Sequence, residues 1–63
     1  MYYIHIISAT AQSITGHART LWGVKRNVAQ SILNHEERYG KDIKSVRIYK
    51  VTKNAPKLIE CIR

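Results

Sequence analysis

The chain has few acidic residues and a single cysteine. Four Asp and Glu stand against eleven Lys and Arg among 63 residues, which gives a formal net charge of +7. So basic a chain cannot imitate a nucleic acid, whose surface must be acidic, and acidic partners are favoured. Because Cys61 has no second cysteine to pair with, an intrachain disulfide and a paired-cysteine metal motif are both excluded. We therefore expect a protein of the reducing cytoplasm.

Long apolar runs are also missing. The first residues lack the positive segment of a signal peptide, and their apolar stretch is interrupted by His5 and ends at Ser8. We expect no targeting segment and no membrane association. A chain of 63 residues predicts one domain, residues 1–63, with a thin core, since so short a chain buries only about 60% of the surface that its unfolded form exposes.

The first half of the chain predicts two strands and a helix. Residues 2–9 are aromatic, β-branched and almost continuously apolar, which favours a central strand, and residues 13–18 fit a second, short strand. Thr20 is suited to begin a helix as its N-cap, and Gly40 is suited to follow its end. The stripe expected to face the sheet comprises Leu21, Val24, Val28, Ile32 and Tyr39, flanked by Trp22, Ala29 and Leu33.

The last third predicts a β-hairpin. Residues 43–52 alternate, with Val46 and Ile48 on the side of the core, and residues 57–63 read as another strand. The intervening residues 53–56 contain Asn and Pro, which favour a turn. The predicted fold is a small α+β domain with one helix packed on a three- or four-stranded antiparallel sheet. One helix covers one face of such a sheet, so the other face is left for water or a partner.

Basic residues recur every three positions after the helix. No acidic residue precedes Glu36, and the series comprises Arg38, Lys41, Lys44, Arg47, Lys50 and Lys53, with Lys57 just beyond. Because side chains alternate along a strand, Lys44 and Lys50 are expected on one face, and Arg47 and Lys53 on the other. Two interpretations stay open for this basic rim: an edge whose lysines discourage aggregation, or a surface that contacts phosphates.

The open face of the sheet is expected to combine rings with basic residues. With the alternation as drawn, Tyr3, His5 and Ile7 of the first strand share this face with Arg47, Tyr49 and Val51. Such a surface suits the stacking of unpaired bases. The alternative is a secondary core or a dimer interface in which the rings are buried, and a shift of one residue exchanges the faces.

A second basic group surrounds the start of the helix and comprises His17, Arg19, Lys25 and Arg26. Helix N-termini attract anions, so a generic phosphate contact is expected here. A specific nucleotide site is not expected, because no Gly-Lys-Ser/Thr follows the glycines.

The positions of the histidines and of the single cysteine in the sequence do not favour catalysis or metal binding. The three histidines are far apart in sequence, and Cys61 reads as a small buried strand residue. We expect no enzyme, no metal site and no cofactor.

The sequence thus predicts a non-enzymatic, nucleic-acid-binding regulatory protein that mainly contacts the phosphate backbone of DNA or RNA. The alternative is an inhibitor or adaptor, of the sort that small viral or mobile-element genomes encode, which binds an acidic protein surface. A homodimer fits either interpretation. The candidate nucleic-acid-binding residues are Arg19, Lys25, Arg26, Lys41, Lys44, Arg47, Tyr49, Lys50, Lys53 and Lys57.

Overall fold

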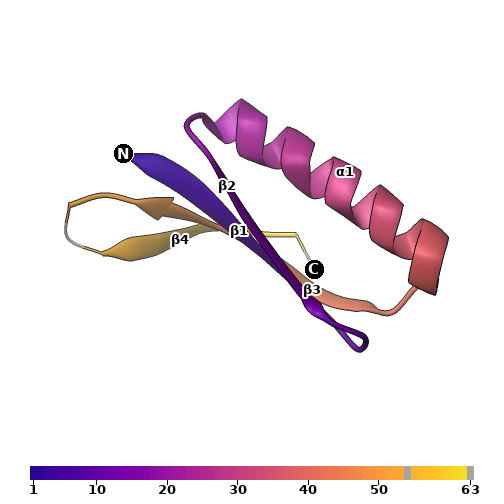
Figure 1. The fold of residues 1–63 in the computed structure, drawn as a ribbon. Coiled ribbons are helices and arrows are strands. Elements are labelled where there is room, and N and C mark those ends of the chain that lie inside the picture. Colours follow the sequence, from indigo (N-terminus) through magenta and orange to yellow (C-terminus); the bar gives the residue numbers. More distant parts are fainter. Residues whose placement is uncertain (54, 63) are drawn as a thin grey trace.

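One helix packs on one face of a four-stranded antiparallel sheet, as the sequence predicts (Figure 1). The computed structural model describes residues 1–53 and 55–62. Its elements are β1 (Tyr2–Ala9), β2 (Ser13–Ala18), α1 (Leu21–Tyr39), β3 (Ile43–Val51) and β4 (Pro56–Cys61). The strands are ordered β2-β1-β3-β4, so β1 and β3 are interior and β2 and β4 form the edges.

The strands follow the residue types that predict them. β1 is the apolar run expected at the centre of the sheet, and it pairs with β2 on one side and β3 on the other. The weaker pattern of residues 13–18 does form a strand. β4 begins at Pro56, which an edge strand tolerates at its first residue because proline has no N–H to donate. The predicted turn residue Asn54 lies outside the described residues.

Both ends of α1 have the predicted caps. The Thr20 hydroxyl accepts a hydrogen bond of 3.0 Å from the backbone N–H of Gly23. At the other end Gly40 has φ +80°, a conformation that strongly favours glycine, and its N–H donates to the Glu36 carbonyl at 2.9 Å. These caps fix the length of the helix.

The core lies between α1 and the sheet. Its buried residues are Ile7, Val24, Val28, Val46 and Ile48. The predicted helix stripe is right in its middle and wrong at its ends: Leu21 and Tyr39 are 36% and 47% exposed, whereas the polar residue His35 is buried.

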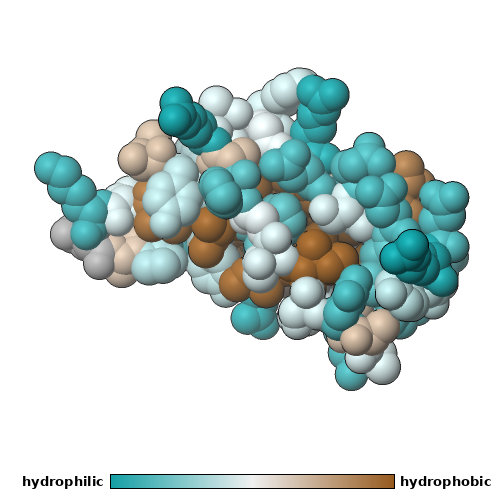
Figure 2. Space-filling view, viewed as in Figure 1, coloured by the Kyte–Doolittle hydropathy of each residue, from teal (hydrophilic) through white to brown (hydrophobic). Residues whose placement is uncertain are grey.

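The side of the sheet away from α1 is called the open face here (Figure 1). Its rows follow from the strand register: Ile4 lies between His17 and Tyr49, and Ile6 lies between Thr15 and Arg47. Figure 2 shows hydrophobic side chains at the surface along the sheet, within a largely hydrophilic exterior. The side chains of the open face are Tyr2, Ile4, Ile6, Thr15, His17, Arg47, Tyr49, Val51, Leu58 and Cys61.

Within the described residues, α1 is the helix present, and it is not apolar enough to cross a bilayer.

Candidate nucleic-acid interface

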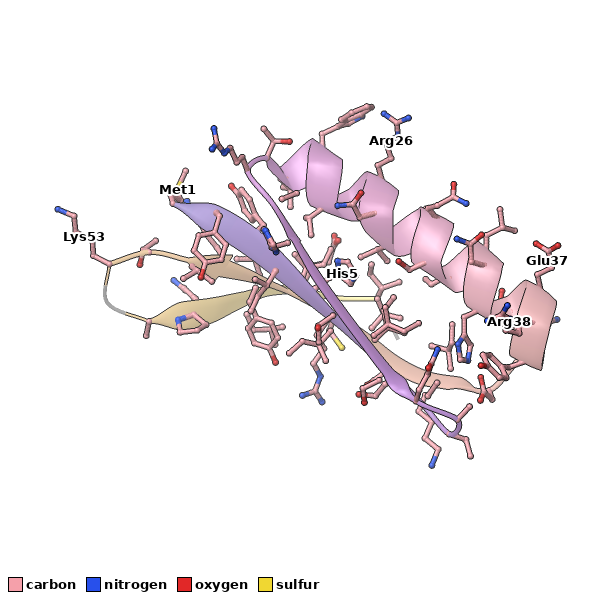
Figure 3. All side chains as sticks on the ribbon, viewed as in Figure 1. Met1, His5, Arg26, Glu37, Arg38 and Lys53 are labelled. Atoms are coloured by element: carbon pink, nitrogen blue, oxygen red, sulfur yellow. The ribbon has the colours of Figure 1, made fainter. Side chains whose placement is uncertain are left out.

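The β3–β4 hairpin extends past the start of α1, with Lys53 at its far end (Figure 3). Lys50 of β3 and Lys57 of β4 are direct partners in the register of this hairpin. Like charges directly opposite each other on a sheet are unfavourable for folding. We call Lys50, Lys53 and Lys57 the hairpin lysines; they concentrate positive charge on a narrow two-stranded projection.

Arg47 and Tyr49 are neighbours on the open face, as the alternation predicts. Hydrogen bonding with the Tyr49 side chain, followed by charge interactions with Tyr49 and Cys61, raises the pKa of Arg47. Tyr49 is half-buried between Ile4 and Leu58 in its row. The guanidinium and the phenol ring therefore form one amphipathic pair in the middle of this face.

The predicted alternation of β1 is wrong by one residue. Tyr3, His5 and Ile7 face α1, because they pair with Lys50, Ile48 and Val46 and line the core side of the sheet. Tyr2, Ile4 and Ile6 take their place on the open face. Aliphatic side chains rather than rings thus flank Tyr49, which reduces the area suited to base stacking.

The basic residues at the start of α1 are partly engaged with other side chains. The Lys25 ammonium lies 3.4 Å from a carboxylate oxygen of Glu60 on β4. The Arg26 guanidinium lies 5.5 Å from the ring centre of Trp22, a cation–π geometry. Arg19 lines an open depression of about 630 Å³ with Tyr2 and His17.

Lys41 and Lys44 lie at the opposite end of the molecule from the hairpin tip. Lys41 is exposed in the connection from α1 to β3, and Lys44 is exposed at the start of β3. Residues separated in this way do not form one continuous stripe with the hairpin lysines. The ten candidate nucleic-acid-binding residues are therefore divided between four places: the β3–β4 hairpin, the open face, the start of α1, and the region from the α1–β3 connection to the start of β3.

All four carboxylate side chains lie away from the open face. Glu36 and Glu37 are in the last turns of α1, and Asp42 is in the α1–β3 connection. Glu60 pairs with Ile48 in the register and points to the helix side, where Lys25 meets it. Among the described residues the open face therefore carries Arg47 and no acidic side chain, whereas Lys50 and Lys57 lie on the same side of the sheet as Glu60.

No pattern in the sequence indicated the contact between His35 and Asp42. The buried His35 ring hydrogen-bonds Asp42 through Nε2 and lies against Tyr39, with ring centres 4.8 Å apart. Asp42 also accepts from the Ala11 N–H at 3.1 Å, which joins the β1–β2 turn to the end of the helix. Burial alone would raise the pKa of Asp42, but the His35 hydrogen bond and then the Ala11 hydrogen bond outweigh it and lower the pKa. The contact stabilises two connections of the fold.

Cys61 is exposed on the open face, not buried as its position in a strand suggested. Among the described residues, no group of three or more His, Cys, Asp or Glu side chains is arranged to hold a metal ion.

Comparison with models of known families, with curated proteins and with solved structures found no match for this chain.

Proposed function

We propose that the protein is a non-enzymatic regulatory protein that binds nucleic acid, mainly through the phosphate backbone. The observation that carries this proposal is the cross-strand pair of Lys50 and Lys57. Lysines at directly opposite strand positions repel each other, and an anion that both side chains reach relieves the repulsion. A phosphate backbone supplies such anions in a regular array.

The position of β3 in the sheet also supports this proposal. Lysines that protect a sheet against aggregation are needed on an edge strand, and Lys57 on β4 is so placed. β3 is an interior strand, yet it carries Lys44, Arg47 and Lys50. Protection of an edge does not account for these three residues, whereas contact with phosphates does.

A second candidate function is binding to a protein surface that is both acidic and apolar. The observation that favours it is the set of partly exposed aliphatic residues around Arg47, namely Ile4, Ile6 and Leu58. Apolar surface left on one face of a small domain commonly marks a protein interface. In this case the open face, and not the hairpin lysines, would make the essential contacts.

The test compares two triple variants with equal changes in charge. Lys50→Gln, Lys53→Gln and Lys57→Gln together neutralise the hairpin lysines; Arg38→Gln, Lys41→Gln and Lys44→Gln neutralise three residues at the other end. We expect the hairpin variant to bind single- and double-stranded oligonucleotides at least about tenfold more weakly than the control variant. Equal losses in both variants would reject the hairpin as the binding element.

We further propose the cytoplasm as the location of the protein, since the exposed thiol of Cys61 suits a reducing compartment.

A further inference from the structure

His5 is a buried side chain with unused hydrogen-bonding atoms. Only 3% of the residue is exposed, and neither ring nitrogen has a hydrogen-bond partner among the described residues. Buried polar atoms in folded proteins are nearly always paired, so each exception calls for an explanation, such as an ordered water or a bound ligand. Burial lowers the pKa of His5, which keeps the ring neutral near pH 7, with one nitrogen donating and the other accepting.

Gly16 makes room for the polar edge of this ring, which lies against the β2 backbone with both nitrogens closed to solvent. Gly16 is the β2 partner of His5, and a Cβ there would lie 2.6 Å from His5 Cε1 and within 3.4 Å of both ring nitrogens. The ring edge that carries both nitrogens therefore points over β2, where any other residue would place a side chain. Figure 3 shows His5 between the strands and α1.

An open depression lies beside this ring edge, between β2 and α1. Its volume is about 430 Å³, within the range of small-molecule sites. On the α1 side it is lined by Asn27, Gln30 and Ser31, and on the β2 side by Thr15, Gly16 and His17. Asn27, Gln30 and Ser31 supply amide and hydroxyl donors and acceptors near the imidazole.

The chemistry of the lining selects the class of ligand. None of the described residues that line the depression is Lys, Arg, Asp or Glu, although the chain as a whole carries +7. An anion or a cation would find no Lys, Arg, Asp or Glu counter-charge in this lining, and an apolar ligand would leave the imidazole nitrogens unpaired. The lining suits a neutral ligand that both donates and accepts hydrogen bonds.

We propose that this depression binds a single unpaired nucleobase, with Asn27 hydrogen-bonding its edge and His5 joining the contact once a shift of the lining side chains exposes its nitrogens. This inference rests on the proposed nucleic-acid binding, which brings such a neutral donor and acceptor group to the protein. Unpaired bases are read in this manner, through hydrogen bonds to their edges.

The test uses nucleosides, because they carry a base but no phosphate and so do not depend on the basic surface. Adenosine, cytidine, guanosine and uridine are titrated in turn, and the imidazole nitrogen and tyrosine ring resonances are followed by NMR. We expect a saturable shift at His5 with at least one nucleoside, while His35, engaged by Asp42, stays unchanged. Absence of any saturable shift at His5, or shifts confined to Tyr49 and Tyr2 of the open face, would overturn the proposal.

Two variants and a control complete the test. Asn27→Ala removes an amide from the depression without touching the core, and it should weaken nucleoside binding at least about fivefold. Gln12→Ala removes an exposed amide outside the depression and should leave binding unchanged. His5→Phe keeps a ring but no nitrogen and should abolish binding. Equal affinity in the Asn27 and Gln12 variants rejects the site.

The two proposals fail in different ways. If nucleosides shift His5 but oligonucleotides bind without dependence on the hairpin lysines, the proposed function is wrong and the site stands. If oligonucleotide binding depends on those lysines but no nucleoside shifts His5, the site is wrong and the function stands.

Discussion

The imidazole of His5 lies directly over Gly16, so that a Cβ at position 16 would come within 2.6 Å of His5 Cε1. Gly16→Ala should therefore destabilise the protein by about 1–3 kcal/mol, because a methyl group is forced into a filled site. Urea denaturation measures the change. The same substitution in a His5→Ala background should have a much smaller effect; an undiminished loss there would show that the ring is not the obstacle.

Stability should fall as the pH is lowered below the ordinary His5 pKa of 6.5. Burial lowers the pKa of His5 in the folded state, so over this range the unfolded chain binds more protons and acid favours unfolding. The contribution of the neutral His5 ring to the free energy of unfolding is complete above pH 6.5. It is lost progressively as the pH falls from 6.5 to the pKa of His5 in the folded state. The neighbouring titratable group in the same depression is His17.

Urea midpoints between pH 7.5 and pH 5 test this expectation. His5→Phe should flatten the profile over that range, and His17→Gln should leave its slope in place. The His35–Asp42 pair affects the stability of the protein at a lower pH than His5 does. Its hydrogen bonds lower the pKa of Asp42 below the ordinary 3.8, so its contribution is present above that value and is lost as the pH falls through the folded-state pKa.

Val28 should be more sensitive to truncation than its apolar neighbour Leu33. Val28 is 3% exposed against the sheet, whereas Leu33 is 61% exposed on the same helix. Val28→Ala should cost about 1.5–3 kcal/mol, from lost burial and the cavity left behind, and Leu33→Ala well under half of that. Thermal or urea melts of the two variants decide the matter, and equal losses would mean that α1 packs by a different face.

Tyr49→Ala separates base stacking from packing on the open face. If Tyr49 stacks on bases, the variant should bind single-stranded nucleic acid more weakly by about 1–3 kcal/mol, with little change in melting temperature. Titration with a labelled oligonucleotide and a parallel melt provide both values. A large loss of stability with unchanged affinity would count for the protein-binding alternative and against stacking.

Local residue chemistry was sufficient to predict most of the fold. Thr20 and Gly40 mark the ends of α1 because a hydroxyl cap and a positive φ each suit particular residue types. The apolar run of β1 indicated an interior strand for a similar reason. The face of β1 could not be predicted in this way, because residues 2–7 are apolar or aromatic at both odd and even positions. Only the pairing of Ile7 with Val46 decides it.

The contacts that the sequence did not indicate join residues through the fold rather than through a periodic pattern. His35 is buried because Asp42, in the next connection, supplies its hydrogen bond, and no helical period includes that residue. Lys25 meets Glu60 across the layers of the structure, 35 positions along the chain. In the same way, charge spacing identified Lys50 and Lys57 as candidates, but their register showed that they face each other.

The salt dependence of oligonucleotide binding tests the central claim most directly. With four to six phosphate contacts, the logarithm of the association constant should fall against the logarithm of the salt concentration with a slope of roughly −3 to −5. Neutralising the three hairpin lysines should reduce that slope by about two to three, since each contact contributes nearly one unit. An affinity that does not depend on salt, or a slope that the hairpin variant leaves unchanged, would contradict the account.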